Sequence, residues 1–382
     1  MSDKTTIGVG MVGYAFMGRV HSQAWRSVGA FFDLPLAPRM AVLAGRSKER
    51  TEAAAAQLGW DAVETDWRAL VQRDDVQIVD ICTPGDSHAE IAIAALAAGK
   101  HVICEKPLAN TVAEAEAMVR AAAEAPGKSM VAFNYRRVPA VALARRYVEE
   151  GKLGEIRHVR TQYLQDWIVD PEFPLVWRLQ KDKAGAGALG DIGSHIVDAA
   201  EFITGQHVVG VSALTETFIK QRPLAGESAG LGATRTEAMG EVTVDDAALF
   251  IGRMSGGALA SFEATRFATG RKNAMRIEIN GQLGSLAFDF ESMNELWFSS
   301  GGGFERILVT EPDHPYVGAW WPPGHGLGYE HTFTHEIKDF LEAIATGTDP
   351  VPSFADGLRV QRVLEAVERS AAEGSRYTNV ED

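Results

Sequence analysis

Thr6-Ile7-Gly8-Val9-Gly10-Met11-Val12-Gly13-Tyr14-Ala15-Phe16-Met17-Gly18-Arg19-Val20-His21 is the stretch that decides the fold of this chain. The apolar run that ends at Val12 predicts a buried strand, the glycines predict a tight turn, and the residues that follow predict a helix. This order is the one a dinucleotide requires, because backbone N–H groups and the positive end of a helix dipole then face the pyrophosphate.

Two glycine frames fit the dinucleotide pattern. The frame at Gly8, Gly10 and Gly13 is preceded only by Met1–Ile7, which is too short and too polar to supply the strand. We therefore prefer the frame Gly13-x-Ala15-x-x-Gly18, although Ala15 narrows the gap to the phosphate by one methyl group. A glycine-rich turn between strand and helix that binds no ligand is the alternative interpretation.

The composition is that of a globular protein, and its length of 382 residues allows two domains. A net charge of −14 argues against nucleic acid or an anionic membrane as the main partner. No apolar run is long enough to span a membrane and Met1–Lys4 lacks a signal-peptide core, so we expect a cytoplasmic protein. Cys82 and Cys104 lie in apolar runs, and we expect both to be buried, reduced thiols.

Strand and helix patterns alternate through the first third of the chain, which predicts a parallel sheet with helices on both faces. We therefore predict an α/β fold whose N-terminal part, residues 1–136, is a doubly wound Rossmann domain. The expected strands after the first are 40–44, 76–83, 101–104 and 129–133, with a Pro-rich connection over 31–39 and helices over 48–58, 87–98 and 111–124.

The second part, residues 137–382, alternates apolar and polar residues in most segments from Val208 onward, which predicts a C-terminal α/β domain with a large, mostly antiparallel open sheet. We expect its exposed face to be covered by another subunit, giving a homodimer or homotetramer. The composition of 222–240, rich in Gly, Ala and Ser, predicts a mobile loop. Helices are expected over 139–150, 332–346 and 354–373.

Ligands of open α/β sheets bind beyond the carboxyl ends of the strands, where Thr83–His88, Glu105–Pro107 and Asn134–Arg137 are expected. Lys106 follows a buried strand and precedes a proline, so it is held near the expected nicotinamide, although an ordinary solvated lysine is the alternative. The expected cofactor contacts are Gly13, Ala15, Phe16, Met17, Gly18, Arg46, Ser47, Thr83, Pro84, His88, Glu105, Lys106 and Asn134.

Asp191 and His195 are four residues apart at the start of an expected amphipathic helix, which would place them on one helical face. A carboxylate beside an imidazole orients it and raises its basicity, as a general base requires. One alternative is that Asp191 simply interacts with the positive N-terminal end of the helix. The other is that Asp191 and His195 make an ordinary surface contact. We expect no metal site, because no third ligand is evident nearby.

Three motifs, in this order along the chain, resemble those of one family: the Gly13–Gly18 turn, Glu105-Lys106-Pro107, and Gly187-x-x-x-Asp191-x-x-x-His195. The resemblance extends over roughly residues 6–375. The family is that of glucose-fructose oxidoreductase, inositol dehydrogenase and MocA. The resemblance implies an NAD(P)-dependent oxidoreductase acting on sugars or polyols, with a C-terminal sheet that mediates oligomerisation. It also implies that Lys106 hydrogen-bonds the reacting hydroxyl, that Asp191 orients substrate or histidine, and that His195 or Lys106 takes the proton.

Within the family, Met130–Ala140 and Tyr163–Trp167 resemble the levoglucosan dehydrogenases, which oxidise a sugar hydroxyl at C3. The expected substrate contacts are Lys106, Tyr135, Tyr163, Gln165, Asp166, Trp167, Arg178, Asp191 and His195, with core packing as the alternative for tryptophan. Gly45-Arg46-Ser47 follows the second strand where NAD enzymes usually place an acid, which favours NADP slightly without excluding NAD. A glycosidase that oxidises its sugar transiently and a non-catalytic dinucleotide sensor are the alternative functions.

Overall fold

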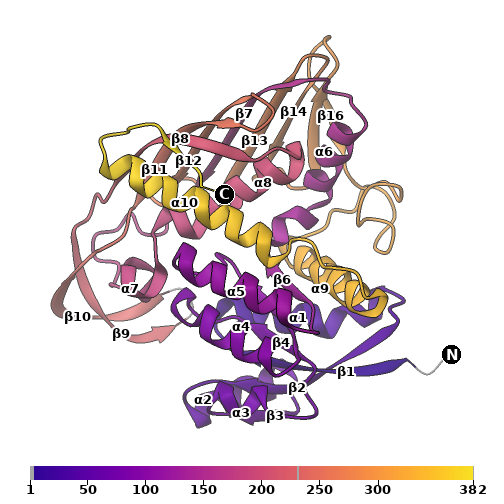
Figure 1. Cartoon of the computed structure of the whole chain (residues 1–382), viewed down its shortest axis with the longest axis vertical. Coiled ribbons are helices and arrows are strands. Elements are labelled where there is room, and N and C mark those ends of the chain that lie inside the picture. The colour runs from indigo at the N-terminus through magenta and orange to yellow at the C-terminus, as the bar shows by residue number, and fades with distance from the viewer. Residues whose placement is uncertain (1–3, 230–231, 382) are drawn as a thin grey trace. The chain divides into compact units, whose positions relative to one another are not determined.

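The structure is a computed structural model that describes residues 4–229 and 232–381. The backbone forms two compact units (Figure 1). The first contains the chain up to Asn134 together with Tyr329–Leu358, and the second contains Tyr135–Gly328 together with the chain from Arg359. The first unit thus takes in a C-terminal segment that the predicted division at residue 136 assigns to the second part.

A parallel sheet of six strands in the order β3-β2-β1-β4-β5-β6 forms the centre of the first unit, as a Rossmann domain requires. Helices connect the strands, so the predicted α/β class is confirmed. The strands are β1 Thr5–Val12, β2 Leu36–Ala44, β3 Ala62–Glu64, β4 Ile78–Ile81, β5 His101–Glu105 and β6 Ser129–Ala132; the helices are α1 Phe16–Phe31, α2 Lys48–Leu58, α3 Trp67–Val71, α4 His88–Ala97 and α5 Val112–Glu124.

The local structure places the junction of strand, turn and helix at the preferred glycine frame. Gly8 lies inside β1, where a Cβ atom would be 1.9 Å from the carbonyl oxygen of Asp75, so this glycine serves packing. Gly13 has a φ of +98° and makes the turn, and α1 begins three residues later. The strand therefore ends immediately before Gly13, as the apolar run predicts.

Two features of the first unit differ from the sequence predictions. The connection expected over 31–39 is wrong from Leu36 onward, because β2 already begins there and Pro38 pairs with Ile7 of β1. Proline is tolerated because β3 pairs only with Val42–Ala44 of β2, so Pro38 lies where the strand has a neighbour on one side alone. The short elements β3 and α3 were not predicted.

The helix α9, Tyr329–Thr346, completes the core of the first unit from the C-terminal part of the sequence. Its buried stripe includes Phe333, Ile337 and Phe340, which belong to the same apolar cluster as Trp25 and Val28 of α1. A spacing of three and four residues places these side chains on one face of α9. The apolar face of α1 is therefore covered by a helix about three hundred residues away in sequence.

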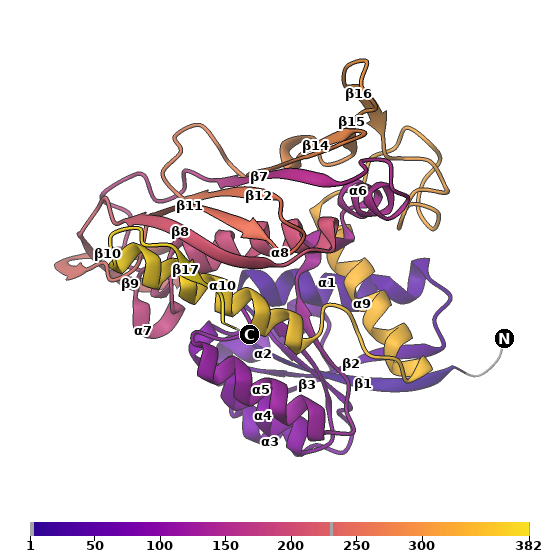
Figure 2. The ribbon, with the colours of Figure 1, turned by 45° about the horizontal axis from the view of Figure 1, so that its top comes forward.

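The second unit is built on a nine-stranded, mixed sheet in the order β16-β15-β14-β13-β7-β12-β11-β8-β17. Its pairs are antiparallel except β12 with β7, so the predicted mostly antiparallel sheet is confirmed. The helices α6 Pro139–Glu149 and α8 Ser194–Thr204 lie along one face (Figure 2). The strands are β7 Ile156–Leu164, β8 Val208–Glu216, β11 Ala247–Met254, β12 Leu259–Thr265, β13 Ala274–Gly281, β14 Ser285–Asp289, β15 Glu295–Ser299, β16 Glu305–Leu308 and β17 Thr378–Asn379; α7 is Lys181–Ala184 and α10 is Phe354–Ala372.

The loop predicted over 222–240 is wrong. The strands β9, Gln221–Ala229, and β10, Gly232–Glu241, pair antiparallel, while residues 230 and 231 lie outside the described residues. Arg222 holds this hairpin, because its buried guanidinium donates to the carbonyl oxygens of Ile168, Asp170 and Phe173. Composition alone missed the strands, because their stability comes from these contacts and not from apolar alternation.

The outer face of the nine-stranded sheet carries exposed apolar side chains over β8, β11 and β12. Leu214 and Leu249 are direct cross-strand partners, and Ile251 and Leu259 lie beside them. Ile251 is 63% exposed. Toward β7 and β13 the face becomes charged, with the ion pair of Arg160 and Glu278. The predicted uncovered apolar face is thus present on this unit.

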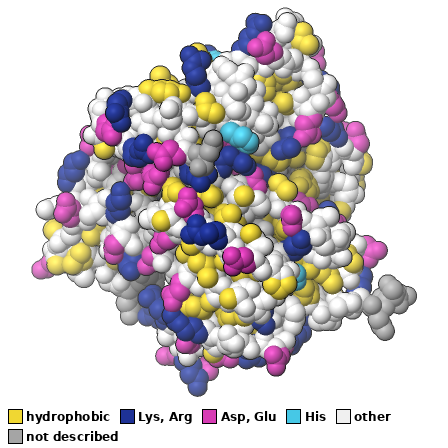
Figure 3. Space-filling model, in the orientation of Figure 1, with side chains coloured by type: hydrophobic (Ala, Val, Ile, Leu, Met, Phe, Trp, Pro, Cys, Tyr) yellow, Lys and Arg dark blue, Asp and Glu magenta, His cyan; other side chains and the backbone are white. Residues whose placement is uncertain are grey.

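Further properties of the described residues bear on the sequence predictions. Both cysteines are free and buried, which confirms the prediction for Cys82 and Cys104. No helix in the described part of the chain is long and apolar enough to cross a membrane. Basic and acidic side chains are interspersed over the face that Figure 3 shows.

Candidate functional site

The carboxyl edge of the Rossmann sheet gathers the predicted cofactor residues of the first unit. Since β1, β4, β5 and β6 are neighbours and parallel, the residues that follow them share one edge. These residues are Gly13 after β1, Thr83–Pro84 after β4, Lys106 after β5 and Asn134 after β6. The sequence placed each of these loops at its strand end correctly.

The turn at Gly13 fits a dinucleotide. A Cβ atom on Gly13 would lie 2.7 Å from the carbonyl oxygen of Cys82, and one on Gly18 would lie 2.3 Å from that of Gly13. The turn therefore admits only glycine at both places. Ala15 is the N-cap of α1, and its methyl side chain cannot cap the N-terminal N–H groups of the helix. A pyrophosphate would find these donors and the positive helix end there.

His88 connects two of the edge loops. One ring nitrogen lies 2.9 Å from the carbonyl oxygen of Thr83 and the other lies 3.1 Å from that of Pro107. Ser87 donates to the hydroxyl of Thr83 at 2.7 Å. The buried His88 thus fixes the loop after β4 against the loop that carries Lys106, and acts on the backbone of the predicted site.

Arg46 and Ser47 follow β2 and precede α2, as predicted. Arg46 is exposed, and the Gly45 amide donates to the carbonyl oxygen of Glu64, the last residue of β3. The carboxylate of Glu64 accepts a hydrogen bond from Arg73 at 2.9 Å. The acid at the end of the adjacent strand is therefore already engaged by a cation, and Arg46 is an exposed charge at this strand end.

Asn134 lies after β6 and binds a segment far away in sequence. Its side-chain amide donates to the hydroxyl of Thr332 at 2.8 Å, and Thr332 donates in turn to the carbonyl oxygen of Tyr329. Asn134 is buried, so this bond anchors the start of α9 to the sheet edge. Whether Asn134 also contacts a cofactor stays a prediction.

A connected set of polar side chains occupies the second unit. The hydroxyl oxygens of Tyr135 and Tyr163 lie 2.7 Å apart, and Tyr163 donates to Oδ1 of Asn273 at 2.6 Å. Gln165 donates to the same oxygen at 2.8 Å, and Trp167 donates to Oε1 of Gln165 at 2.9 Å. Four of these five residues are predicted sugar contacts, and the structure brings all four together.

His195 joins this network through Tyr135. Their ring centroids are 4.3 Å apart, and His195 lies in the first turn of α8. Asp191 belongs to a π-helical turn, Leu189–Gly193, that precedes α8, so the expectation of one continuous α-helical face is wrong. A guanidinium nitrogen of Arg266 lies 3.6 Å from the Asp191 carboxylate, and Arg266 also faces the ring of Trp167. Asp191 thus has a cationic neighbour that sequence reasoning did not identify.

Two predicted sugar contacts have structural partners. Asp166 accepts hydrogen bonds from Lys272 at 2.7 Å and from the Gly270 amide at 2.9 Å, and the Lys272 ammonium lowers the pKa of this carboxyl. Asp166 therefore holds the segment that carries Asn273. The guanidinium of Arg178 lies over the ring of its neighbour Trp177.

Asp245 is a further residue that sequence reasoning missed. Its carboxylate accepts hydrogen bonds from the amides of Gly187 at 2.7 Å and Leu189 at 2.8 Å, directly before Asp191. Its carbonyl oxygen accepts from Ala188 at 3.1 Å. Carboxylates often accept hydrogen bonds from the first amides of a helical turn. The acidic pair Asp245-Asp246 between two strands was therefore the sequence feature that could have indicated this role. Asn273 and Arg266 gave no comparable signal.

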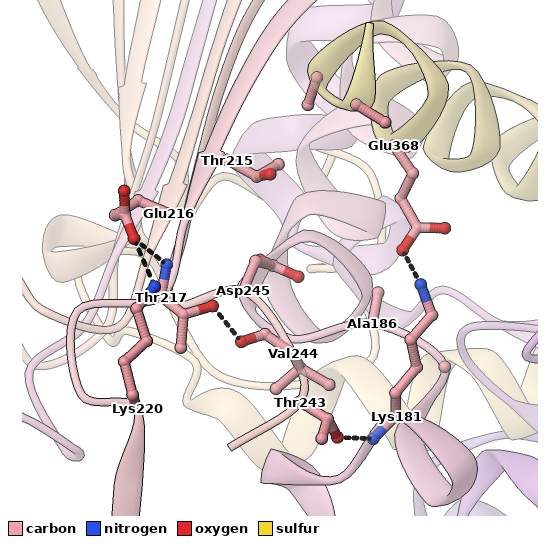
Figure 4. A pocket seen from close by; sticks show the side chains of 13 residues that line it. Lys181, Ala186, Thr215, Glu216, Thr217, Lys220, Thr243, Val244, Asp245 and Glu368 are labelled. Atoms are coloured by element: carbon pink, nitrogen blue, oxygen red, sulfur yellow. Dashed lines mark hydrogen bonds and ion pairs between the residues drawn. The ribbon is translucent and has the colours of Figure 1, made fainter. Parts of the chain in front are cut away.

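Asp245 also lines a polar pocket of about 370 Å³ (Figure 4). The pocket is framed by the ion pair of Lys181 with Glu368 and that of Lys220 with Glu216, each at 2.8 Å. Each lysine is thus paired with a glutamate, whereas the carboxylate of Asp245 is held by backbone amides.

Among the described residues, His21, Asp80 and Cys82 of the first unit form a buried, hydrogen-bonded cluster. Their potential metal-ligand atoms lie within 4.8 Å of one another.

Comparison with known proteins agrees with this architecture. The family model "Oxidoreductase family, NAD-binding Rossmann fold" matches residues 7–133, and the model "GFO/IDH/MocA C-terminal domain" matches residues 141–287. Levoglucosan dehydrogenase from Pseudarthrobacter phenanthrenivorans is 44% identical over 380 residues, 97% of each protein.

Two solved structures extend the similarity. An oxidoreductase domain protein from Kribbella flavida is 63% identical, with a TM-score of 0.94 over 99% of this chain and 100% of that one. A levoglucosan dehydrogenase in complex with NADH and levoglucosan is 43% identical, with a TM-score of 0.93 over the same shares. The similarity therefore covers both units.

Proposed function

Because the chain belongs to the GFO/IDH/MocA family of NAD-binding oxidoreductases, we propose that it oxidises a secondary hydroxyl of a sugar, anhydrosugar or cyclitol to a ketone. The observation that carries the proposal is the polar network of Tyr135, Tyr163, Asn273, Gln165 and Trp167 on the family's C-terminal domain. Hydroxyl and amide groups beside an aromatic ring are what a polyol needs for recognition. The relative that binds NADH and levoglucosan supports this substrate class.

Oxidation removes a hydride from carbon and a proton from its hydroxyl, and a carbonyl remains. A bound nicotinamide dinucleotide supplies the hydride acceptor. In this proposal Lys106 hydrogen-bonds the reacting hydroxyl, and either His195 or Lys106 takes its proton. Asp191 orients the substrate or the histidine. The proton acceptor must be held in place to be efficient, and the packing of His195 against Tyr135 supplies such support.

The dinucleotide-binding residues belong to the first unit. The turn Gly13–Gly18 and the N-terminus of α1 would hold the pyrophosphate, and Arg46 with Ser47 would face the adenosine ribose. An arginine and a hydroxyl suit a 2′-phosphate, and Glu64 is engaged by Arg73. We therefore favour use of NADP at least as well as NAD, while the NADH-bound relative keeps NAD open.

The outer face of the sheet supports a proposal about the oligomeric state. Leu214, Leu249, Ile251 and Leu259 form an exposed apolar stripe, which a second copy of the chain would cover. The burial of such a face stabilises an assembly more than any of the surrounding ion pairs does. We propose a homodimer or homotetramer built on this face.

One assay tests the reaction directly. The purified protein is offered a panel of sugars, anhydrosugars and cyclitols with NAD or NADP, and the absorbance of the reduced nicotinamide is recorded. We expect absorbance to rise with at least one secondary alcohol and to stay flat when the alcohol is omitted. Release of an aglycone from a glycoside without net reduction of the cofactor would contradict a simple dehydrogenase. The Lys106→Met variant, assayed in the same way, is the negative control.

A further inference from the structure

A buried cluster of charged side chains lies beneath the loop that carries Lys106. His21 of α1 has one ring nitrogen, Nδ1, 3.0 Å from both carboxylate oxygens of Asp80, and the other, Nε2, 3.0 Å from Oε1 of Glu105. All three residues are at most 4% exposed. Buried charges persist only when they are paired and hydrogen-bonded. A proton must therefore lie between each ring nitrogen of His21 and the carboxylate that it faces.

The remaining partners determine where the protons lie. Asp80 also accepts hydrogen bonds from the indole of Trp25 at 2.7 Å and from the thiol of Cys82 at 3.3 Å. Asp80 therefore lies against an imidazole, an indole and a thiol. Glu105 uses its second oxygen, Oε2, to accept the backbone N–H of Lys106 at 3.0 Å. Each of the two carboxylates thus lies within hydrogen-bond distance of one ring nitrogen of His21.

We propose that His21 is a positioning residue for Lys106: as a doubly protonated imidazolium it bridges Asp80 and Glu105, so that Glu105 holds the Lys106 backbone in place. The catalytic consequence rests on the proposed function, whereas the protonation and the held backbone do not. His21 lies in the helix that begins at the dinucleotide turn. One side chain thereby links the cofactor turn with the loop of Lys106.

The electrostatics of the cluster support the imidazolium. Burial by itself would lower the pKa of His21, but the Asp80 carboxylate raises it well above 6.5. The titratable groups around His21 are Asp80 and Cys82 from β4 and the loop after it, and Glu105 and Cys104 from β5. Burial raises the pKa of both thiols, so neither adds a competing charge near neutral pH.

The first experiment measures protonation and the held backbone without any substrate. In ¹⁵N-histidine spectra of the full chain at pH 8, we expect the signals that disappear in His21→Gln to be those of an imidazolium. Hydrogen exchange of the Lys106 amide should accelerate in His21→Gln, because glutamine cannot donate to both carboxylates. A neutral His21 in the wild type, or unchanged Lys106 exchange in the variant, would overturn the proposal.

The matched control is Trp25→Phe. It removes a donor to Asp80 but leaves the bonds from His21 to Glu105 and from Glu105 to Lys106 intact. We expect normal exchange at Lys106 and nearly normal turnover in this variant. Equal losses in Trp25→Phe and His21→Gln would show that His21 only packs the core, and would refute a positioning role.

The second experiment uses turnover of a sugar that the wild type oxidises. Displacement of a catalytic group can lower the reaction rate about 10²-fold. We therefore expect His21→Gln to lower kcat by about that factor and to leave NADH binding unchanged. Glu105→Gln should retain more activity than Glu105→Ala, because an amide oxygen can still accept the Lys106 N–H. If His21→Gln fails to fold, Glu105→Gln against Glu105→Ala decides the same question by Lys106 exchange.

Failure of the proposed function and failure of the positioning role of His21 give different results. A wild type that oxidises no sugar would contradict the proposed function, but the imidazolium signal and the Lys106 exchange would still report on the cluster. An active wild type with unaltered kcat in His21→Gln would contradict the positioning role and leave the proposed function standing.

Discussion

The carboxylate of Asp245 accepts the backbone N–H of Gly187 at 2.7 Å, and a Cβ atom on Gly187 would lie only 1.8 Å from the carbonyl oxygen of Asp245. This contact fixes the backbone immediately before the π-helical turn that carries Asp191. A π-helical turn is a rare conformation that is often found at functional sites. The glycine is therefore required by a close backbone approach, and the aspartate holds the approach in place.

Replacement of Gly187 by Ala should disturb this contact. The added methyl group must push Asp245 away, and overpacking of this kind costs typically 1–3 kcal/mol of unfolding free energy. Denaturant unfolding followed by fluorescence measures the loss, and turnover should fall as the Asp191 turn moves. Gly193→Ala is the control, since its methyl group would meet atoms only at 3.4 Å or more. Equal stability of the two variants would contradict the packing argument.

Replacement of Lys106 by Met or His195 by Ala should each lower kcat by about 10²- to 10⁴-fold, the range for loss of general acid–base catalysis. NADH binding should be nearly unchanged, because the dinucleotide is held by the Gly13–Gly18 turn. The two losses should not add in the double variant if both groups act on one hydroxyl proton. Stopped-flow turnover and NADH fluorescence measure the two effects.

The pH profile separates the roles of Lys106 and His195. Oxidation releases a proton, so wild-type activity in the oxidative direction should rise with pH. His195→Ala should flatten this rise if His195 is the base. A variant that keeps most of its turnover and the wild-type profile would make His195 structural. Lys48→Met, at an exposed position in α2, is the control for loss of a lysine.

Replacement of Asn273 by Ala should weaken sugar binding. Asn273 accepts hydrogen bonds from both Tyr163 and Gln165, and each bond contributes about 0.5–1.5 kcal/mol. We expect KM for the sugar to rise about tenfold, with a smaller change in kcat. Asn280→Ala, in β13 just after Asn273 and in contact with Ser285, is the control. A KM unchanged in the Asn273 variant would exclude a role of this network in recognition.

Replacement of Arg46 by Asp should shift cofactor preference toward NAD, because a carboxylate repels a 2′-phosphate and accepts a hydrogen bond from a 2′-hydroxyl. The ratio of kcat/KM for NADP and NAD is the measurement. Arg50→Asp in α2 makes the same charge change and serves as the control. A wild type that uses NAD alone and is indifferent to the substitution would show that Arg46 does not contact the ribose.

Replacement of Ile251 by Lys should break the proposed assembly. Its side chain is exposed on β11 beside Leu249, and a buried lysine there would lack a partner. Light scattering at micromolar concentration should give a dimer or tetramer for the wild type and a smaller mass for the variant. Arg253→Lys, on the same strand and face, should leave the mass unchanged. A monomeric wild type would refute the assembly.

The local elements of the first unit were predictable from sequence because their signals are local. The apolar run before Gly13, the helix expected over 111–124 and the span of α2 all follow from periodicity and breakers within one turn or strand. The loops with Thr83, Lys106 and Asn134 followed from the same logic, because parallel strands share a carboxyl edge.

Tertiary structure decided what depends on distant partners. The hairpin β9–β10 forms around Arg222 and the carbonyl oxygens of another segment, so its composition suggested only a loop. The helix α9 completes the core of α1, and Arg266 and Asn273 reach Asp191 and Tyr163 from other strands or loops. These contacts join residues tens to hundreds of positions apart, where periodicity carries no information. The sequence by itself therefore determined the fold class and the motif residues, and tertiary packing determined their partners.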